Sequence, residues 1–399
     1  MSDPWNEFIA GEQGAESAGY FESRSTRPDG LGAATWYAGA PDIRTIGPRS
    51  VPTDESRDAA RFLRGSRQRA IVGYLGFDAV GIFEPRLRRF PSGSPFPLGE
   101  FAFVDRVHRA RVPNRTGRLP DSDVRAPGRP SADSLPRRPF ERAVRRLVEE
   151  IRNGEAYQIV LSHRRAWARP EDLRAAASQL RRTERFAFFY YLRFADREIV
   201  GASPESVVEV VGDRAYLNPI AGTIPRGASR VDRRPLSVDP KELAEHRMLV
   251  DLARNDLGAV ARPGTVRLLS VEKLERYARL DHLVTHVGAR LKPGVGPWEV
   301  LGAAFPAGTV SGAPKIRATE LLRREERSWR GPYAGAVGLL DAPGRAQWAL
   351  AIRTAFAAER RLYTAAGAGI VHRSTPAREF DETLTKLSQV ESTVVGGAS

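Results

Sequence analysis

Two pairs of glutamates have the spacing that most directly suggests chemistry. Glu242 and Glu245 stand three residues apart, and Glu379 and Glu382 repeat that spacing. Residues at positions i and i+3 share one face of a helix, so each pair projects from one side of its helix. Carboxylate oxygens are the donors that Mg²⁺ prefers. A structural alternative stays open, with Glu242 in a capping box and Glu382 in an i, i+4 ion pair with Lys386.

Three glycine-containing segments could bind an anion. Pro219–Gly227 and Phe305–Lys315 each place a threonine directly after a glycine, at Gly222-Thr223 and Gly308-Thr309. Turns of this kind bring backbone N–H groups and a hydroxyl close to a bound anion. The third segment, Ala366–Ile370, precedes the second glutamate pair. None of the three matches the P-loop or the dinucleotide-binding fingerprint.

Lysine is rare in this chain, and its placement is informative. The 62 basic residues include only five lysines, at positions 241, 273, 292, 315 and 386. Lys241, Lys315 and Lys386 fall inside the glutamate or glycine segments. An ammonium and a guanidinium differ in size and in donor geometry. This pattern indicates that arginine is not acceptable at these three positions.

Two helices must carry the glutamate pairs. The first is predicted to begin with Asp239 as its N-cap and Pro240 as its first residue, and to end at Gly258. The second is predicted to start at Thr375-Pro376 by the same logic. Apolar residues at helical spacing predict another helix over 140–151, ended by Asn153-Gly154.

Short apolar runs bounded by glycine or proline predict the strands. They lie at Ala70–Gly76, Glu100–Val104, Tyr157–Ser162, Ala187–Phe194, Glu198–Ala202 and Val207–Val211. Several are separated by hairpin-length connections. This mixture predicts an α+β fold, a layered α/β sandwich, in preference to a regular βαβ wind.

A stretch rich in arginine and proline divides the chain. Residues 105–138 contain nine arginines and five prolines, and this composition predicts a linker or loop. It separates an N-terminal part of the sandwich, residues 1–104, from a C-terminal region, residues 139–399. We expect the two to form one integrated structural domain.

Composition excludes several classes of function. The net charge of +14 is compatible with nucleic-acid binding, but the arginines are interleaved with 48 acids and no nucleic-acid motif is present, so we expect no nucleic-acid partner. The absence of cysteine excludes disulfides, thiolate metal sites and a cysteine nucleophile from this chain. No apolar run approaches the roughly 18 residues of a membrane span, and the first residues do not read as a signal peptide, so we expect a cytoplasmic protein.

The order of the motifs resembles the chorismate-binding enzyme family, and within it the anthranilate synthase component I type. The motifs that carry the resemblance are Gln158–Arg164, Gly201–Glu205, Pro219–Thr223, Lys241–Gly258, His282–Thr285, Phe305–Lys315, Arg330–Gly335, Ala351–Thr354 and Ala366–Lys386. Gly73–Asp78 and Phe83–Pro85 resemble the N-terminal part of the family. The resemblance therefore covers most of the chain.

The resemblance implies a Mg²⁺-dependent enzyme that acts on chorismate between two β-sheets. It implies that Glu205 is the general acid for the departing C4 hydroxyl, that His282 is linked to the loss of pyruvate, and that Gln158 takes the place of a catalytic base. The implied metal ligands are Glu242, Glu245, Glu379 and Glu382. The implied substrate-binding residues are Gly222, Thr223, Thr309, Tyr333, Arg353, Gly367, Gly369 and Lys386.

Two positions discriminate among the reactions of the family. Members that add water resemble one another in carrying a lysine base where this chain has Gln158, and glutamine cannot abstract a proton from water. Aminodeoxychorismate synthases commonly carry an attacking lysine where this chain has Ala221. The remaining reaction is attack of ammonia at C2, which gives 2-amino-2-deoxyisochorismate and, after loss of pyruvate, anthranilate.

Other functions stay open at this point. The enzyme could stop at 2-amino-2-deoxyisochorismate, in a dedicated secondary-metabolite pathway. It could instead be an aminodeoxychorismate, isochorismate or salicylate synthase, or a non-catalytic or nucleic-acid-binding relative. Both glutamate pairs are intact in this sequence, and this argues against a decayed site.

The resemblance also bears on regulation and partners. Tyr20–Ser23 resembles one element of a tryptophan feedback pocket, whereas the second element is replaced by Glu184–Phe188, which predicts weak or absent tryptophan inhibition. A glutaminase in this family uses a cysteine nucleophile, so ammonia is expected to come from a separate glutamine amidotransferase subunit. A homo- or hetero-oligomer is compatible with this expectation.

Overall fold

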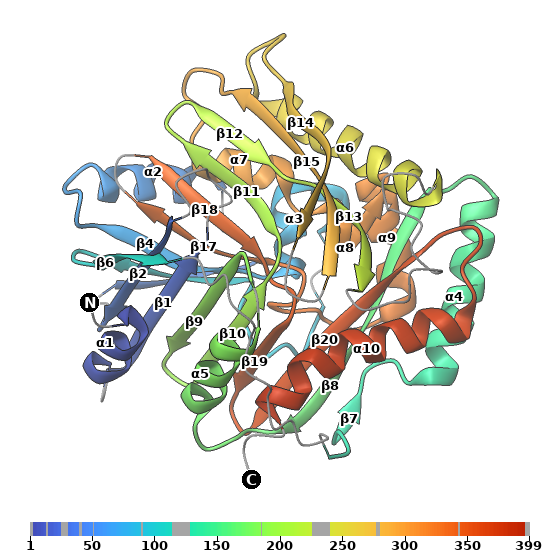
Figure 1. Ribbon diagram of the computed structural model, residues 1–399, viewed down its shortest axis with the longest axis horizontal. Helices are drawn as coiled ribbons and strands as arrows, with labels where there is room; N and C mark the ends of the chain where they lie inside the picture. The colour runs from blue at the N-terminus through green and yellow to red at the C-terminus, as the bar shows by residue number, and fades with distance from the viewer. Residues whose placement is uncertain are drawn as a thin grey trace.

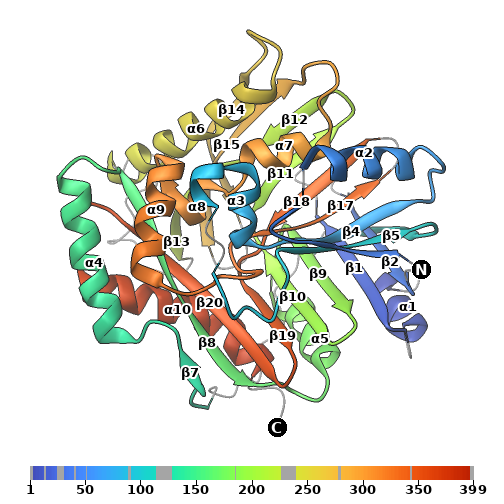
Figure 2. The ribbon, with the colours of Figure 1, turned by 180° about the vertical axis from the view of Figure 1, so that it is seen from behind.

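The apolar strand segments gather into two facing β-sheets, and helices pack on the outer sides (Figures 1 and 2). The computed structural model describes residues 3–12, 15–24, 31–39, 42–50, 52–88, 91–113, 128–184, 186–225, 240–276, 280–341 and 344–395. This architecture confirms the predicted α+β layered sandwich.

Sheet A, the lower sheet in Figure 1, pairs its strands antiparallel. Its spatial order is β16 (Gly312–Ala313), β8 (Gln158–Ala168), β20 (Arg361–Ile370), β19 (Thr354–Ala358), β10 (Arg197–Ser203), β9 (Phe188–Phe194), β1 (Ser17–Ser23), β2 (Leu31–Ala38) and β6 (His108–Pro113). A short strand, β7 (Ala132–Asp133), also pairs with β8.

Sheet B is antiparallel as well. Its order is β13 (Ile220–Pro225), β15 (Leu280–Arg290), β12 (Arg214–Leu217), β11 (Ser206–Val211), β18 (Arg345–Leu350), β17 (Ala336–Asp341), β4 (Ala70–Leu75), β5 (Gly99–Val104) and β3 (Asp42–Ile46). The strand β14 (Arg267–Arg276) pairs with β15.

The helices divide between the two sheets. Sheet A is contacted by α1 (Pro4–Gly11), α4 (Arg137–Arg152), α5 (Leu173–Thr183) and α10 (Pro376–Val394). Sheet B is contacted by α2 (Pro52–Leu63), α6 (Pro240–Val260) and α7 (Pro297–Ala304). The short helices α3 (Val80–Phe83) and α8 (Gly308–Ser311), and the longer α9 (Lys315–Glu326), lie near the end of the sandwich where β8 and β16 pair (Figure 2).

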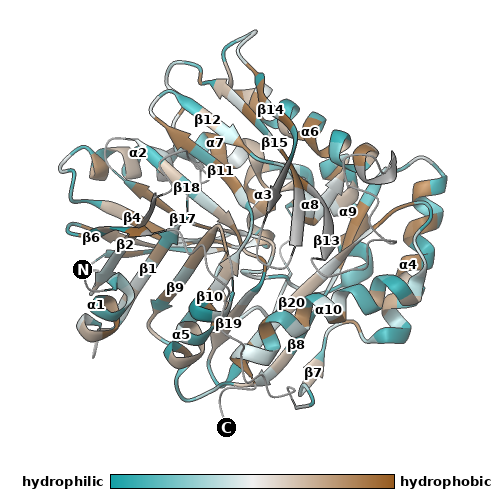
Figure 3. Cartoon of the chain, in the orientation of Figure 1, coloured by the Kyte–Doolittle hydropathy of each residue, from teal (hydrophilic) through white to brown (hydrophobic). Residues whose placement is uncertain are grey.

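Two apolar cores hold these layers together. The larger one joins the facing sides of both sheets and includes Tyr190 of sheet A and Trp348 of sheet B, both fully buried. The smaller one lies between sheet A and its helices, around Trp5, Phe189 and Leu180. The colouring in Figure 3 agrees with this arrangement, because hydrophobic residues follow the strands and hydrophilic residues mark the outer sides of the helices. Burial of apolar surface on this scale is the main stabilising term of the fold.

The predicted strands and the predicted helix over 140–151 are confirmed, mostly with shifts of one to three residues at their ends; the strand predicted over 157–162 is longer, because β8 continues to Ala168. The helix α10 begins at Pro376 with Thr375 as N-cap, as predicted, although the Thr375 side chain makes no capping hydrogen bond. The predicted end of α6 at Gly258 is wrong, because α6 continues to Val260. The predicted N-cap Asp239 lies outside the described residues.

Two predicted loops are in fact strands. Residues Ile220–Pro225 form β13, and the glycine cluster Ala366–Ile370 lies within β20. Each strand pairs along its length with a neighbour, β15 or β8, and those cross-strand hydrogen bonds offset the low strand propensity of glycine.

The predicted linker over residues 105–138 also needs correction. It contains β6, which pairs with β2, and β7, which pairs with β8. Residues 114–127 lie outside the described residues. Strands from the first 104 residues extend both sheets, so this part of the chain does not form a sheet of its own. Within the described residues, no helix is long and apolar enough to cross a membrane.

Candidate functional site

About half of the predicted site residues lie on α6, α8, α10, β8 and β20, and the others lie on β13, on β15 or in connecting segments. The helix α8 contacts α6, β8 and β20, and α10 packs along β20. These elements are far apart in sequence, so only the fold brings them together.

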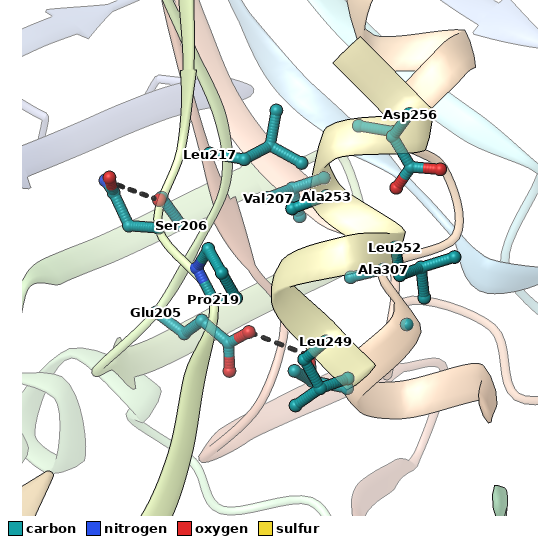
Figure 4. A pocket seen from close by; sticks show the side chains of 14 residues that line it. Glu205, Ser206, Val207, Leu217, Pro219, Leu249, Leu252, Ala253, Asp256 and Ala307 are labelled. Atoms are coloured by element: carbon teal, nitrogen blue, oxygen red, sulfur yellow. Dashed lines mark hydrogen bonds between the residues drawn. The ribbon is translucent and has the colours of Figure 1, made fainter. Parts of the chain in front are cut away.

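Glu205 and Thr309 are paired beside a pocket. Glu205 sits in the short connection between β10 and β11, and the Thr309 hydroxyl donates a hydrogen bond to Glu205 Oε1 at 2.7 Å. The pocket measures about 370 Å³, including space open to solvent. In Figure 4, Glu205 faces α6 across this pocket, where Leu249 and Leu252 form much of the opposite wall.

The pocket changes the acidity of Glu205. Burial raises the pKa of the Glu205 carboxyl to about 7, while the hydrogen bond from Thr309 opposes part of this rise by stabilising the ionised form. The backbone holds the carboxyl in place, since Leu350 N–H donates to the Glu205 carbonyl at 2.9 Å. A carboxyl with this pKa can donate a proton near neutral pH.

A second group joins β8, β20 and α6. Gln158 is 4% exposed, and its side-chain amide donates to Glu245 Oε1 at 3.0 Å. Its other amide atom, Oε1, is buried without a hydrogen-bond partner. A Cβ atom on Gly369 would lie only 2.4 Å from Gln158 Nε2, so glycine is what allows the amide to lie across β20.

A third group joins α10 to β20. The Lys386 ammonium lies 2.7 Å from Glu382 Oε1 and donates to the Gly367 carbonyl at 2.9 Å. Both side chains are about half exposed, at 48%. The i, i+4 ion pair considered in the sequence is therefore present, and its ammonium is held at the same strand as Gly369. Glu379 lies one turn earlier and, with Glu382, lines a cavity beside α10.

The glutamates are chemically suited to a divalent cation but are not gathered into one cluster. Among the described side chains, no three acidic or histidine groups come close enough together to bind a metal. The Glu242 side chain lies outside the described ones. Glu245, Glu379 and Glu382 supply only hard oxygen donors, and the unpartnered Gln158 Oε1 adds a buried acceptor beside Glu245. This donor set fits Mg²⁺.

The sequence-predicted residues of β13 and β15 are neighbours. Thr223 is paired in register with His282, and Gly222 lies at the irregularity in this pairing between Ala221 and Thr223. The side chains of Thr223 and His282 lie outside the described ones. The backbone therefore places the two positions side by side but leaves their chemistry as a prediction.

Arg353 lies between β18 of sheet B and β19 of sheet A, and Tyr333 lies in the connection from α9 to β17. Arg353 forms no salt bridge with another described residue. Burial lowers the pKa of its guanidinium, and the negative charge of Glu184 partly opposes this effect. Its backbone has a positive φ of 50°. Tyr333 is 4% exposed, and burial raises the pKa of its hydroxyl. A desolvated guanidinium that forms no direct salt bridge with a described residue can bind an anionic ligand.

Sequence reasoning missed Asp256 and His163. Asp256 lines the same pocket as Glu205 and forms a salt bridge with Lys315. The rarity of lysine in the chain pointed to Lys315, and a search for its acidic partner could have found Asp256. His163 joins Asp133 to Thr383 of α10. Nothing in the local sequence distinguishes His163 from a surface histidine, because its partners are 30 and 220 residues away.

Comparison with known proteins gives a consistent result. The profile of the family described as "chorismate binding enzyme" matches residues 33–392. Anthranilate synthase component 1 of Saccharolobus solfataricus is 37% identical over 339 residues, which cover 81% of this chain and 80% of the relative. The protein of the same name from Streptomyces coelicolor is 38% identical over 366 residues, which cover 79% of this chain and 71% of the relative.

Solved structures share the fold. The crystal structure of anthranilate synthase component I from Streptococcus pneumoniae aligns with a TM-score of 0.78 and 28% identity, covering 92% of this chain and 93% of the other. The menaquinone-specific isochorismate synthase from Escherichia coli aligns with a TM-score of 0.77 at 19% identity, covering 99% and 92%. At that identity the second likeness concerns the fold alone.

Proposed function

The chain belongs to the chorismate-binding enzyme family, and from this premise we propose that it aminates chorismate at C2 with ammonia and then eliminates pyruvate to give anthranilate. In the first step ammonia forms the C2–N bond, both ring double bonds shift (C1=C2 to C1=C6 and C5=C6 to C4=C5), and the C4–O bond breaks. The released oxygen leaves as water, and the added nitrogen loses a proton. In the second step the C3–O bond to the enolpyruvyl group breaks, C2 loses its hydrogen, and the ring becomes aromatic.

The observation that carries this proposal is the protonatable carboxyl of Glu205. Departure of a hydroxyl from C4 needs an acid that still holds its proton near neutral pH. Burial raises the pKa of Glu205 to about 7, and Thr309 fixes one of its oxygens. Glu205 therefore suits the role of the group that protonates the departing oxygen.

Cationic groups would bind the two carboxylates of the substrate. The Arg353 guanidinium has no salt-bridge partner among the described residues. The Lys386 ammonium donates a hydrogen bond to the Gly367 carbonyl. Tyr333, Thr309, Thr223 and the glycines at 222, 367 and 369 complete the proposed binding surface. At Gly367 and Gly369 an added Cβ would lie 3.0 Å from the Leu161 carbonyl oxygen and 2.4 Å from Gln158 Nε2, so a larger residue at either position would displace its neighbours.

The four glutamates Glu242, Glu245, Glu379 and Glu382 would hold Mg²⁺. Bound there, Mg²⁺ would neutralise the ring carboxylate of the substrate. Glu382 would exchange its present ion pair with Lys386 for the cation, which would free the ammonium for the substrate. Gln158 would orient Glu245 through its amide hydrogen bond.

The contacts of Gln158 support ammonia over water as the nucleophile. Its amide nitrogen donates to Glu245, and no proton-accepting amine stands at this position. Ala221 likewise offers no nucleophile of its own. Ammonia needs no general base to become nucleophilic, so the absence of a lysine at both positions is compatible with amination.

The test is product analysis from chorismate, Mg²⁺ and ammonium at alkaline pH, with parallel reactions lacking ammonium. We expect anthranilate fluorescence and its mass only when ammonium is present. An aminated intermediate without fluorescence would instead assign an enzyme that stops at 2-amino-2-deoxyisochorismate. Formation of isochorismate from water alone, or no turnover at all, would refute the amination proposal. Glu205→Gln provides the matched inactive control, because an amide cannot donate the proton.

A further inference from the structure

Two buried charged groups take no part in the proposed reaction. Lys315, the first residue of α9, places its ammonium 2.8 Å from Asp256 Oδ2 on α6 and donates to the Ala304 carbonyl at 3.1 Å. The Lys315 and Asp256 side chains are 13% and 12% exposed. Asp256 lines the same pocket as Glu205, and Figure 4 shows it further along α6 from Leu249.

The Lys315 ammonium brings the two ends of one segment, residues 304–315, together. Ala304 is the last residue of α7, so the Lys315 ammonium joins the two ends of residues 304–315 and attaches both to α6. The helix α8, with Thr309, lies inside this closed segment. The charged contact therefore spans the element that presents Thr309 to Glu205.

The approach of α8 to α6 is close. A Cβ atom on Gly308 would lie 2.1 Å from Leu252 Cδ2. Leu252 and Asp256 are four residues apart and share one face of α6. Lys315 therefore binds Asp256 on the same face of α6 against which α8 packs.

We propose that Lys315 is a positioning residue: through Asp256 and Ala304 it holds α8 against α6, so that the Thr309 hydroxyl stays on the Glu205 carboxyl. The proposal rests on the proposed function only in giving Glu205 the role of acid. It also explains why a chain with so few lysines has one here, because a compact ammonium can serve two acceptors where a guanidinium needs more room.

A second anchor limits the expected damage when Lys315 is replaced. The buried Arg330 donates to the Val310 carbonyl of α8 at 2.7 Å. This contact does not involve Lys315 or Asp256. Replacing Lys315 should therefore loosen α8 near Thr309 and leave its other end attached.

The predicted signature is a change in the titration of Glu205. The Thr309 hydrogen bond lowers the pKa of this carboxyl, so its loss raises that pKa further above 7. Among the described residues, the other ionisable group that lines the pocket is Asp256 on α6, and its partner Lys315 on α9 lies directly behind it. Loss of the Lys315 charge could raise the same pKa directly, and the experiment must separate the two causes.

The experiment is a ¹³C NMR titration of side-chain carboxyls in the full chain, with Glu205 assigned by Glu205→Gln. The variants are Lys315→Met, Thr309→Val and the double variant. We expect each single variant to raise the Glu205 midpoint by about one pH unit. The double variant should show no further rise beyond Thr309→Val, because both changes remove the same hydrogen bond. An unchanged midpoint in Lys315→Met, or additive shifts, would overturn the proposal.

Two further variants guard against misfolding and general lysine effects. Lys315→Gln combined with Asp256→Asn replaces the ion pair by a neutral pair, and we expect it to fold and keep the midpoint closer to that of the wild type than Lys315→Met does. Lys292→Met removes a lysine whose ammonium donates to the Ala259 carbonyl, and it should leave the midpoint unchanged. A shifted midpoint in Lys292→Met would contradict the proposal.

The titration needs no substrate, so it separates this inference from the proposed function. Shifted midpoints in a protein that does not turn over chorismate would support the role of Lys315 and refute the reaction. Turnover of chorismate with unshifted midpoints would support the reaction and refute the role of Lys315.

Discussion

At the scale of single residues, the protonation of Glu205 should set the pH dependence. The carboxyl must hold its proton to act, and its pKa is raised to about 7. With the concentration of free NH₃ held constant, kcat/KM should be level below pH 7 and fall about tenfold per pH unit above it. Initial-rate measurements between pH 6 and 9 test this.

The same shift has a consequence for stability. A pKa above the ordinary value of a carboxyl means that protonated Glu205 favours the folded state, and this contribution is lost as the pH rises through about 7. Glu205→Gln should keep the neutral form at all pH values.

A rate profile that stays level up to pH 9 in the wild type would contradict the assignment of Glu205 as the acid.

Gly369 is expected to be essential for reasons of space alone. In Gly369→Ala, the new Cβ would lie 2.4 Å from Gln158 Nε2 and displace the amide from Glu245. We expect a drop in kcat/KM of at least about tenfold and a raised KM for Mg²⁺, measured by steady-state kinetics.

The matched control is Gly258→Ala, in the interior of α6. A Cβ there meets no atom within 4 Å. Alanine should preserve activity and stabilise the helix by about 0.5–1 kcal/mol, measured by denaturant unfolding. Equal activity of the two variants would show that the position of Gln158 does not matter.

At the scale of elements, α10 must be held in register, because it carries Glu379, Glu382 and Lys386. Its inner face is attached by a buried polar chain. His163 lies 2.9 Å from Thr383 Oγ1 through Nε2 and 2.9 Å from Asp133 Oδ1 through Nδ1. Both His163 and Thr383 are at most 1% exposed. This chain joins α10 to β8 and β7.

Thr383→Val tests this attachment. The change keeps the shape of the side chain but leaves a buried histidine nitrogen without its partner, which should cost about 1–3 kcal/mol. We expect a lower Tm and a raised KM for Mg²⁺. Ser388→Ala, on the exposed side of the same helix and not among the residues that line the cavity beside Glu379 and Glu382, should change neither quantity. Equal effects of both variants would refute a specific role for the buried chain.

At the scale of the whole molecule, the two segments that were compared with a tryptophan pocket lie on neighbouring strands, and a buried charge there is already paired within the protein. Tyr20–Ser23 and Phe188 are neighbours, since Ser23 pairs with Phe188 between β1 and β9. The fully buried Glu22 accepts hydrogen bonds from Arg181 at 2.8 Å and from Tyr20 at 2.9 Å. We therefore expect weak or absent inhibition by tryptophan, measured as the rate of anthranilate formation up to millimolar tryptophan. An inhibition constant in the low micromolar range would contradict this.

Ammonia supply is also a property of the whole assembly. The chain has no cysteine and so cannot provide the nucleophile of a glutaminase. The purified chain should form product with ammonium and none with glutamine, and a separate glutamine amidotransferase subunit should restore glutamine use. Product from glutamine with the purified chain alone would refute the need for a partner.

The sequence by itself determined the family, the layered fold and the identity of most proposed site residues. Local patterns were sufficient for this, because apolar periodicity, helix caps and ordered motifs are written in neighbouring residues. It misjudged places where a partner strand decides the outcome. Glycine-rich β13 and β20, and β6 inside the predicted linker, are strands because a neighbouring strand pairs with them.

Only the tertiary structure decided which groups meet and in what electrostatic state. Burial raises the pKa of Glu205, and burial depends on α6 and α8, which lie about 40 and 100 residues away in the sequence. The contact of Lys315 with Asp256 and that of His163 with Thr383 are likewise long-range. Sequence can name the carboxyl that is proposed as the acid, but desolvation and hydrogen bonding set its pKa, and both arise from packing between distant segments.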